Sequence, residues 1–200
     1  MTTFTEKAII IPSIESDIFF DRPEAQLWLG VVAVGPNILY PAEYAGSGIL
    51  RANVYIDEKG YLPLDKRLSN GTEQDIDDLR STHIVALENM KPGIVNVIGT
   101  TRLIHKSSKN EFLPVEELFS EKFPKPLAKN SSEVSRFISR HNQKTIRSLT
   151  SLLLIKSLIT EAQKSNSSDV YGIVESYFPK ILSSIGIPFF INIYIGPQDT

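Results

Sequence analysis

Two stretches of this sequence decide how it folds: SSEVSRFISR at residues 131–140 and VNVIGTTRLI at residues 95–104. Both are rich in β-branched and apolar residues, which is typical of strands in a buried sheet. Each nevertheless carries charge, Glu133 and Arg136 in the first stretch and Arg102 in the second. Because a charge in a core strand is costly unless it is paired or used, these residues are the first indication of function.

On a regular strand Glu133 and Arg136 point to opposite faces, because side chains alternate with a period of two. Glu133 then shares its face with Ser135 and Phe137. The two charges can meet only if a bulge redirects one of them, and bulges are common beside active sites. A structural ion pair, or two charges on an edge strand, is the simpler interpretation of this spacing.

The elements around these strands predict a mixed sheet flanked by helices. Further strands are predicted at 50–56, 83–87, 170–174 and 188–195. Short helices are predicted at 114–119 and at 178–185, the latter closed by Gly186, and a long amphipathic helix at 145–164. We therefore predict an α/β (α+β) fold with a mostly antiparallel, twisted sheet.

This pattern places the domain at residues 50–200. Residues 1–49 contain apolar runs at 8–11 and 27–34 that prolines interrupt, and periodicity alone does not decide whether these runs are strands or buried helix. The segment is too short to form a core of its own. We predict that it is an N-terminal arm packed on the domain.

The composition excludes several classes of protein. The net charge of −2 argues against a general nucleic-acid binder, and the absence of cysteine excludes disulfides and thiolate chemistry. No apolar run approaches the ~20 residues of a membrane span. The first 20 residues mix acids and a proline with their apolar part, unlike a signal peptide. A cytoplasmic protein is therefore expected.

Asp75 and Asp78 are three residues apart and face the same way on a helical turn. Two neighbouring carboxylates repel unless a cation lies between them, so this pair could bind an amine or a sulfonium. A solvated acidic first turn of a helix is the simpler alternative. His83, His105 and His141 have no metal-ligand spacing, so no metal site is predicted.

Basic residues gather at the start of the long helix: Arg140, Lys144 and Arg147. A helix N-terminus with cations around it attracts a phosphate or an acidic protein. A solvated basic rim is the simpler interpretation.

Four motifs, taken in order, resemble the acyl-homoserine-lactone (autoinducer) synthases. They are R-x-x-x-Y at 51–55, E-x-D-x-x-D at 73–78, G-x-x-R-L at 99–103 and E-x-S-R-F at 133–137. The segment FLPVEELF at 112–119 is also similar to the family, and so is the order of helix, strand, helix and SIGIPF that follows. The resemblance covers roughly residues 48–190.

The resemblance implies the GNAT acyltransferase fold and a reaction that makes a quorum-sensing signal. Members of the family join an acyl chain, carried by acyl carrier protein or coenzyme A, to the amine of S-adenosylmethionine. Lactonisation then releases methylthioadenosine. No permanently bound cofactor is implied, because S-adenosylmethionine and the acyl thioester are both substrates.

The resemblance also implies roles for individual residues. Glu133 takes the position of the general base, acting directly or through water, and Arg136 supports the site. The S-adenosylmethionine side is assigned to Arg51, Tyr55, Tyr61, Asp75, Asp78 and Arg102.

Apolar residues near the predicted site are candidates to line an acyl-chain slot or, equally, to form core: Phe137, Ile138, Leu152 and Leu153. The basic residues 140, 144 and 147 would meet the phosphopantetheine phosphate or the carrier protein. Two other functions stay open. One is an N-acyltransferase for another amine, such as an amino acid, and the other is a non-catalytic module that binds acyl chains or acyl carrier protein.

Overall fold

The strands of the sheet lie side by side in chain order. The computed structural model describes residues 17–22, 27–34, 41–91, 94–174, 178, 182–183 and 186. Within them is a six-stranded sheet. Its strands are β1 (Asp17–Arg22), β2 (Leu27–Val34), β3 (Ser81–Lys91), β4 (Ile94–His105), β5 (Ser131–Ser139) and β6 (Asp169–Gly172). Neighbours are antiparallel from β1 to β5, and β6 is parallel to β5, so the predicted mixed, mostly antiparallel sheet is confirmed.

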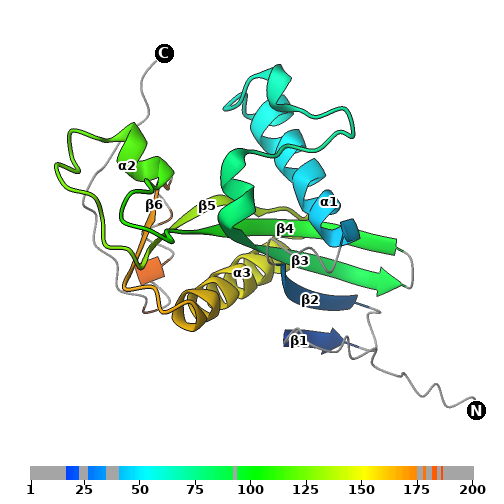
Figure 1. The fold of residues 1–200 in the computed structure, drawn as a ribbon. Coiled ribbons are helices and arrows are strands. Elements are labelled where there is room, and N and C mark those ends of the chain that lie inside the picture. Colours follow the sequence, from blue (N-terminus) through cyan, green and yellow to red (C-terminus); the bar gives the residue numbers. More distant parts are fainter. Residues whose placement is uncertain are drawn as a thin grey trace, which may run out of the picture.

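Helices lie on both faces of this sheet. The long helix α3 (Lys144–Lys164) covers one face, and α1 (Pro41–Arg51) lies over the other (Figure 1). The shorter helices are the π-helix η2 (Ala52–Glu58), the 3-10 helices η3 (Leu64–Lys66) and η4 (Ile76–Arg80), and α2 (Pro114–Leu118). None of the helices in the described ranges combines the length and the apolar composition that a membrane crossing requires.

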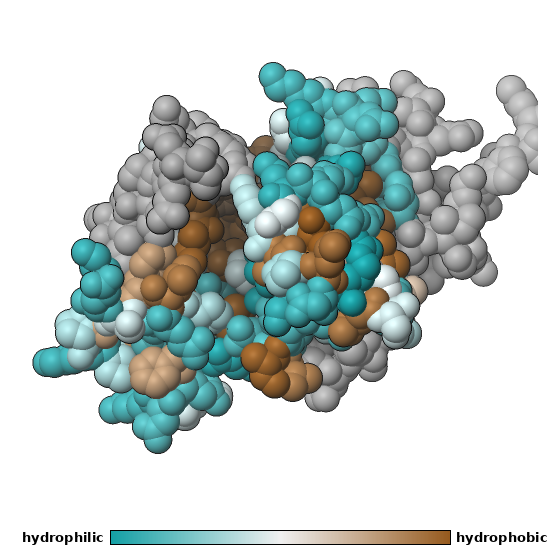
Figure 2. Space-filling model, turned by 90° about the horizontal axis from the view of Figure 1, so that it is seen from above, coloured by the Kyte–Doolittle hydropathy of each residue, from teal (hydrophilic) through white to brown (hydrophobic). Residues whose placement is uncertain are grey.

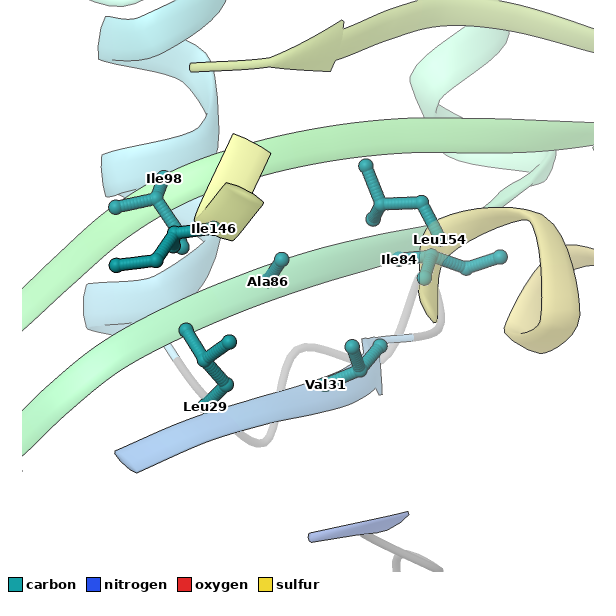
Figure 3. Close-up of a cluster of buried hydrophobic side chains, with 7 residues drawn as sticks. All are labelled: Leu29, Val31, Ile84, Ala86, Ile98, Ile146 and Leu154. Carbon is teal, nitrogen blue, oxygen red and sulfur yellow. The ribbon is translucent and has the colours of Figure 1, made fainter. Parts of the chain in front are cut away.

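The main hydrophobic core lies between α3 and the sheet. Alternate residues of β2 and β3 point toward the helix, which follows from the two-residue period of a strand (Figure 3). The buried members of this cluster are Leu29, Val31, Ile84, Ala86, Ile98, Ile146 and Leu154. Full burial of a large aliphatic side chain contributes about 1.5–3 kcal/mol, so this cluster accounts for much of the attachment of α3.

The predicted strand at 50–56 is wrong. The chain there is helical, because α1 ends at Arg51 and passes directly into η2. The alternation of apolar and polar residues suggested a strand, but Leu50, Arg51, Ala52 and Ile56 are the positions that become buried. Ala52 and Ile56 are four residues apart, as are Ser47 and Arg51, and this spacing fits one face of a helix. Short apolar patterns are ambiguous between strand and helix.

The other predicted elements that fall on described residues are confirmed. The strands expected at 83–87, 95–104, 133–139 and 170–174 correspond to β3, β4, β5 and β6, and the helices expected at 114–119 and 145–164 to α2 and α3. The runs at 8–11 and 188–195 lie outside the described residues, as does most of 178–185. Gly186 has a φ of +75°, the left-handed conformation expected of a helix-closing glycine.

The N-terminal part of the chain contributes to the same sheet. The run at 27–34 is strand β2, which pairs with β3 from Leu29↔Glu88 to Val34↔His83. Helix α1 packs against β4 and β3. The division into an arm at 1–49 and a domain at 50–200 stays a prediction.

Gly99 of β4 lies where α3 crosses the sheet, and its lack of a side chain permits the close approach. A Cβ at this position would lie 2.7 Å from Thr150 Cγ2 and 3.0 Å from the carbonyl oxygen of Ile138. We expect Gly99→Val to lower the free energy of unfolding by about 2–3 kcal/mol in urea denaturation, because overpacking forces the helix away. The exposed Ser148→Val on α3 is the control, with a change below about 0.5 kcal/mol. Equal losses in the two variants would contradict this role of Gly99.

Candidate active site

Six charged side chains from distant parts of the chain meet on the face of the sheet that α1 covers. Three are arginines and three are acids, so their formal charges cancel. We call this group the arginine–carboxylate cluster: Arg51, Arg102, Arg136, Glu73, Asp75 and Asp78. They come from the end of α1, the segment before η4, η4 itself, β4 and β5. Five of the six were selected from the sequence.

Asp78 is at the centre of the cluster. Arg51 donates to its two oxygens from Nη1 and Nη2 at 2.9 and 3.1 Å, and Arg102 Nη1 donates at 2.6 Å. The backbone N–H of Asp75 adds a fourth bond at 3.0 Å. Burial alone would raise the pKa of Asp78, but the hydrogen bonds and charge of Arg51, with the charge of Arg102, hold it at about 2. The chain itself therefore supplies the cations that the acidic pair needs.

Glu73 closes the inner part of the cluster. Arg51 Nε donates to Glu73 Oε2 at 2.5 Å, and both side chains are 2% exposed. Arg136 Nη2 donates to Glu73 Oε1 at 3.0 Å. Breaking a buried pair by removing one partner typically costs about 3–5 kcal/mol, so these contacts fix α1 to the sheet. Glu73 was not among the predicted site residues, although it is the first residue of the E-x-D-x-x-D motif.

The outer edge of the cluster reaches solvent. Arg102 donates from Nη1 and Nη2 to the two oxygens of Asp75 at 2.5 and 2.8 Å, and Arg136 Nη2 donates to Asp75 Oδ2 at 3.2 Å. The side chains of Asp75 and Arg136 are 28% and 20% exposed, whereas Arg102 is 3% exposed. These hydrogen bonds hold the pKa of Asp75 below its ordinary value despite its burial. A ligand would therefore meet Asp75 and Arg136 first.

The bulge that the sequence analysis allowed for is present in β5. Arg102 pairs with Ser135 and Thr100 with Ile138, so two residues of β5 oppose one residue of β4. Arg136 has a φ of +56°, in the left-handed region. The bulge turns its side chain to the face of Ser135, whose hydroxyl accepts a hydrogen bond from Arg102 Nε at 2.8 Å. Ser135, like Glu73, was not among the predicted site residues.

Glu133 lies on the same face as the cluster but does not belong to it. It is two residues before Ser135 on β5 and 2% exposed. The backbone N–H of Val115 donates to Glu133 Oε2 at 2.8 Å. Burial raises the pKa of Glu133 to about 7, although the Val115 N–H and the charge of Arg102 act in the opposite direction. Within the described residues, Oε1 accepts no hydrogen bond and Arg136 forms no ion pair with this carboxylate.

A buried ion pair fixes the helix that contacts Glu133. Lys106, just after β4, donates from Nζ to both oxygens of Glu116 at 2.9 Å, and neither side chain is more than 1% exposed. The same carboxylate accepts the N–H groups of Leu113 at 2.8 Å and Leu127 at 2.7 Å. This pair anchors α2, and with it the Val115 N–H. No local sequence pattern predicts this ion pair, because the sequence around Lys106 is typical of a turn.

Three aromatic residues selected from the sequence lie around the bulge. The Tyr55 hydroxyl donates to the carbonyl oxygen of Phe137 at 3.4 Å, and its ring lies 5.3 Å from the Arg136 guanidinium carbon. Tyr61 is 59% exposed, with its ring 6.1 Å from that of Tyr55. Phe137 is half-buried and packs against the core under α3, and its ring contacts Phe178. Tyr55 and Tyr61 therefore border the outer edge of the cluster.

The basic residues at the start of α3 are all exposed: Arg140, Lys144 and Arg147. Arg140 forms an ion pair with Glu58 at the end of η2. Of the candidate lining residues, Ile138 is buried, Leu153 packs against the core under α3, and Leu152 is 40% exposed. None of these residues lies in the arginine–carboxylate cluster.

The molecule is hollowed on the side of the sheet that carries α1 and α2. Figure 2 shows a hollow between the part that carries α2 and the part that carries α1, with hydrophobic residues on its α2 side. The pairing of β5 with β6 ends at Val134↔Gly172, whereas β5 continues to Ser139. Ile173 and Val174, just beyond β6, are 51% and 42% exposed. The two strands therefore separate at the level of the bulge.

Comparison with known proteins identifies the fold of the chain. No protein-family model matches the sequence, and a search of curated proteins finds no relative. Solved structures do match. A coenzyme A-dependent acyl-homoserine lactone synthase, BjaI, with S-adenosylmethionine and isopentyl-CoA, is 19% identical, with a TM-score of 0.61 over 77% of this chain and 70% of its own.

Two further structures extend the comparison. The acyl-homoserine lactone synthase LasI is 18% identical, with a TM-score of 0.60 over 79% of this chain and 78% of its own. An acetyltransferase from Trypanosoma brucei is 11% identical, with a TM-score of 0.51 over 84% of this chain and 97% of its own. The fold of the chain is therefore the GNAT-like acyltransferase fold, in the form that the acyl-homoserine lactone synthases have.

Proposed function

We propose that the chain is an N-acyltransferase that makes an acyl-homoserine lactone from S-adenosylmethionine and an acyl thioester. The observation that carries the proposal is Glu133, a buried carboxylate with a raised pKa beside the bulged and opened edge of β5. A structural carboxylate is normally held ionised by partners, as Asp78 is. Among the residues that the structure describes, Glu133 instead has one hydrogen-bond donor, the N–H of Val115, and its pKa is about 7.

Glu133 would act as the general base. The attacking group is the α-amine of S-adenosylmethionine, which is an ammonium in water and must lose a proton before it can attack. Glu133 Oε1, directly or through a water, would take that proton. The free amine then attacks the thioester carbonyl, the new C–N bond forms, the C–S bond breaks, and the thiol leaves with a proton.

The acyl donor would enter where β5 and β6 separate. Backbone N–H groups at a bulge are not all used in the strand ladder, and such groups can stabilise the oxyanion that forms during acyl transfer. The exposed Ile173 and Val174 would face the acyl chain. The basic residues Arg140, Lys144 and Arg147 would meet the phosphate of coenzyme A or of phosphopantetheine, or the surface of acyl carrier protein.

The arginine–carboxylate cluster would border the amine substrate. Asp75 and Arg136 are its exposed members, and Tyr55 and Tyr61 lie next to them. After acylation, the carboxylate of the methionine part would attack its own γ-carbon. The C–S bond to the sulfonium then breaks, its electrons neutralise the sulfur, and methylthioadenosine leaves as the lactone closes.

One observation favours a second function. The carboxylates of Asp75 and Asp78 already accept hydrogen bonds from Arg51, Arg102 and Arg136. The cluster therefore holds no carboxylate reserved for a sulfonium. An N-acyltransferase that acylates another amine, such as an amino acid, would keep Glu133 and the acyl slot without an adenosyl site.

A product assay tests these proposals. The protein is mixed with S-adenosylmethionine and a series of acyl-CoA and acyl-carrier-protein donors, and both free thiol and methylthioadenosine are measured. We expect the two products in equal amounts. Thiol release only with amino acids, and no methylthioadenosine, would establish the second function. Binding of acyl-CoA without release of either product would leave a non-catalytic acyl-binding module.

Glu133→Gln should abolish most of the turnover. The amide keeps the size of the side chain and can still accept the Val115 N–H, but it cannot take a proton, so we expect a loss of about 100-fold or more in kcat. The thermal unfolding temperature should stay close to that of the parent protein or rise. Glu117→Gln, at an exposed acid on α2, is the matched control and should keep full activity. A Glu133→Gln protein with normal turnover would remove Glu133 from the mechanism.

The raised pKa of Glu133 should also appear in the pH dependence of stability. Between pH 4.5 and about 7 the folded protein keeps a proton that the unfolded chain has released. The stabilising contribution is therefore fully present below pH 4.5 and is lost as the pH rises through about 7. The difference between the ordinary pKa of 4.5 and the folded-state pKa of about 7 corresponds to roughly 3 kcal/mol of stability. In urea unfolding between pH 5 and 8, the parent should lose this stability and Glu133→Gln should not, and parallel curves would contradict the assignment.

A further inference from the structure

Arg136 combines two features that are rarely found together. It is a bulky residue with a φ of +56°, and its side chain forms ion pairs with Glu73 and Asp75. A left-handed backbone is unfavourable for any residue with a Cβ and persists only where the surroundings enforce it. Contacts with neighbouring residues must therefore stabilise Arg136 in this conformation.

The two features depend on each other. On a regular strand the side chain of residue 136 would point away from Ser135 and Glu133, toward the face that α3 covers. Only the left-handed turn at the bulge brings the guanidinium to Glu73 Oε1, at 3.0 Å, and to Asp75 Oδ2, at 3.2 Å. The ion pairs cannot form without the bulge, and once formed they oppose its return to a regular strand.

The backbone on either side of Arg136 is held as well. The carbonyl oxygen of Ser135 accepts a hydrogen bond from Thr101 Oγ1 at 3.1 Å, and that of Phe137 accepts one from Tyr55 at 3.4 Å. The Tyr55 ring also lies against the guanidinium. These contacts fix the ends of the bulge, and the Arg136 side chain fixes its middle.

We propose that Arg136 is a positioning residue that acts through its own backbone. Its ion pairs hold residue 136 in the left-handed conformation, and this sets the shape of the β5 bulge where the strand separates from β6. The part of this inference that concerns turnover rests on the proposed function, because the bulge is where the acyl carbonyl would bind. The conformational part does not depend on any substrate.

The test compares Arg136→Gly with Arg136→Ala. Both variants lose the guanidinium and all its contacts, but glycine adopts a positive φ without cost and alanine does not. We expect the Gly variant to have a folding equilibrium constant about three- to tenfold larger than that of the Ala variant, measured by urea unfolding. Arg67, whose φ is −83° and which pairs with Asp57, is the matched control. There we expect the ordinary order, with Ala at least as stable as Gly.

The kinetic readout separates positioning from simple stability. At saturating acyl-CoA and S-adenosylmethionine, the Gly variant should keep a kcat at least about fivefold above that of the Ala variant. The KM for S-adenosylmethionine should rise equally in both, because both lack the same side chain. Equal kcat values would overturn the positioning role.

The outcomes distinguish this inference from the proposed function. An Ala variant as stable as the Gly variant would overturn the conformational claim, whatever the activity. No turnover by the parent chain would reject the proposed function and leave the stability comparison valid. If both variants fail to fold because Glu73 is left with one partner fewer, the comparison is made with Glu73→Gln added to each, which removes the buried charge.

Discussion

The structure on the α1 face of the sheet depends on the burial of charge in complete pairs. Asp78 is almost fully buried and accepts four hydrogen bonds, from Arg51, Arg102 and the backbone of Asp75. These bonds tie α1, η4 and β4 together at one point. A buried charge that loses its partner typically costs about 3–5 kcal/mol, so the arrangement tolerates few alternatives. The cluster therefore acts as a structural support, and its outer edge, Asp75 and Arg136, reaches solvent.

Two carboxylates on this face have opposite environments. Asp78 has arginines around it and a pKa of about 2, whereas Glu133 accepts a hydrogen bond from the backbone of α2 and has a pKa of about 7. One is permanently ionised and the other can exchange a proton near neutral pH. Separation of two acids by their surroundings is a common basis for acid–base chemistry in enzymes. The buried Lys106–Glu116 pair contributes to the environment of Glu133, because it anchors α2, whose Val115 N–H donates to that carboxylate.

The sequence predicted the sheet well. Residue type and spacing pointed to most of the charged residues of the cluster, but only the family resemblance assigned them to one site. The strands around Arg102 and Glu133 have β-branched, alternating patterns that depend on local residues alone, and α3 has a broad apolar stripe. The segment at 50–56 failed because its burial is decided by partners far along the chain: Arg51 contacts acids 22 and 27 residues away. No local pattern identifies a buried arginine. The left-handed conformation of Arg136 could not be predicted either. The two-residue period of a strand indicates which face a side chain occupies, but it does not show where a bulge lies.

The exposed rim of the cluster has an electrical consequence. Its two solvent-facing members carry opposite charges and lie in contact, with 3.2 Å between Arg136 Nη2 and Asp75 Oδ2. A ligand with a single charge is attracted by one of these two side chains and repelled by the other, so the two electrostatic energies largely cancel. A zwitterion, with an ammonium and a carboxylate a few ångströms apart, can match both ends at once. A ligand at this edge would therefore be selected by the orientation of its charges and not by their sum, a selection that a neutral surface or a simple basic patch would not provide.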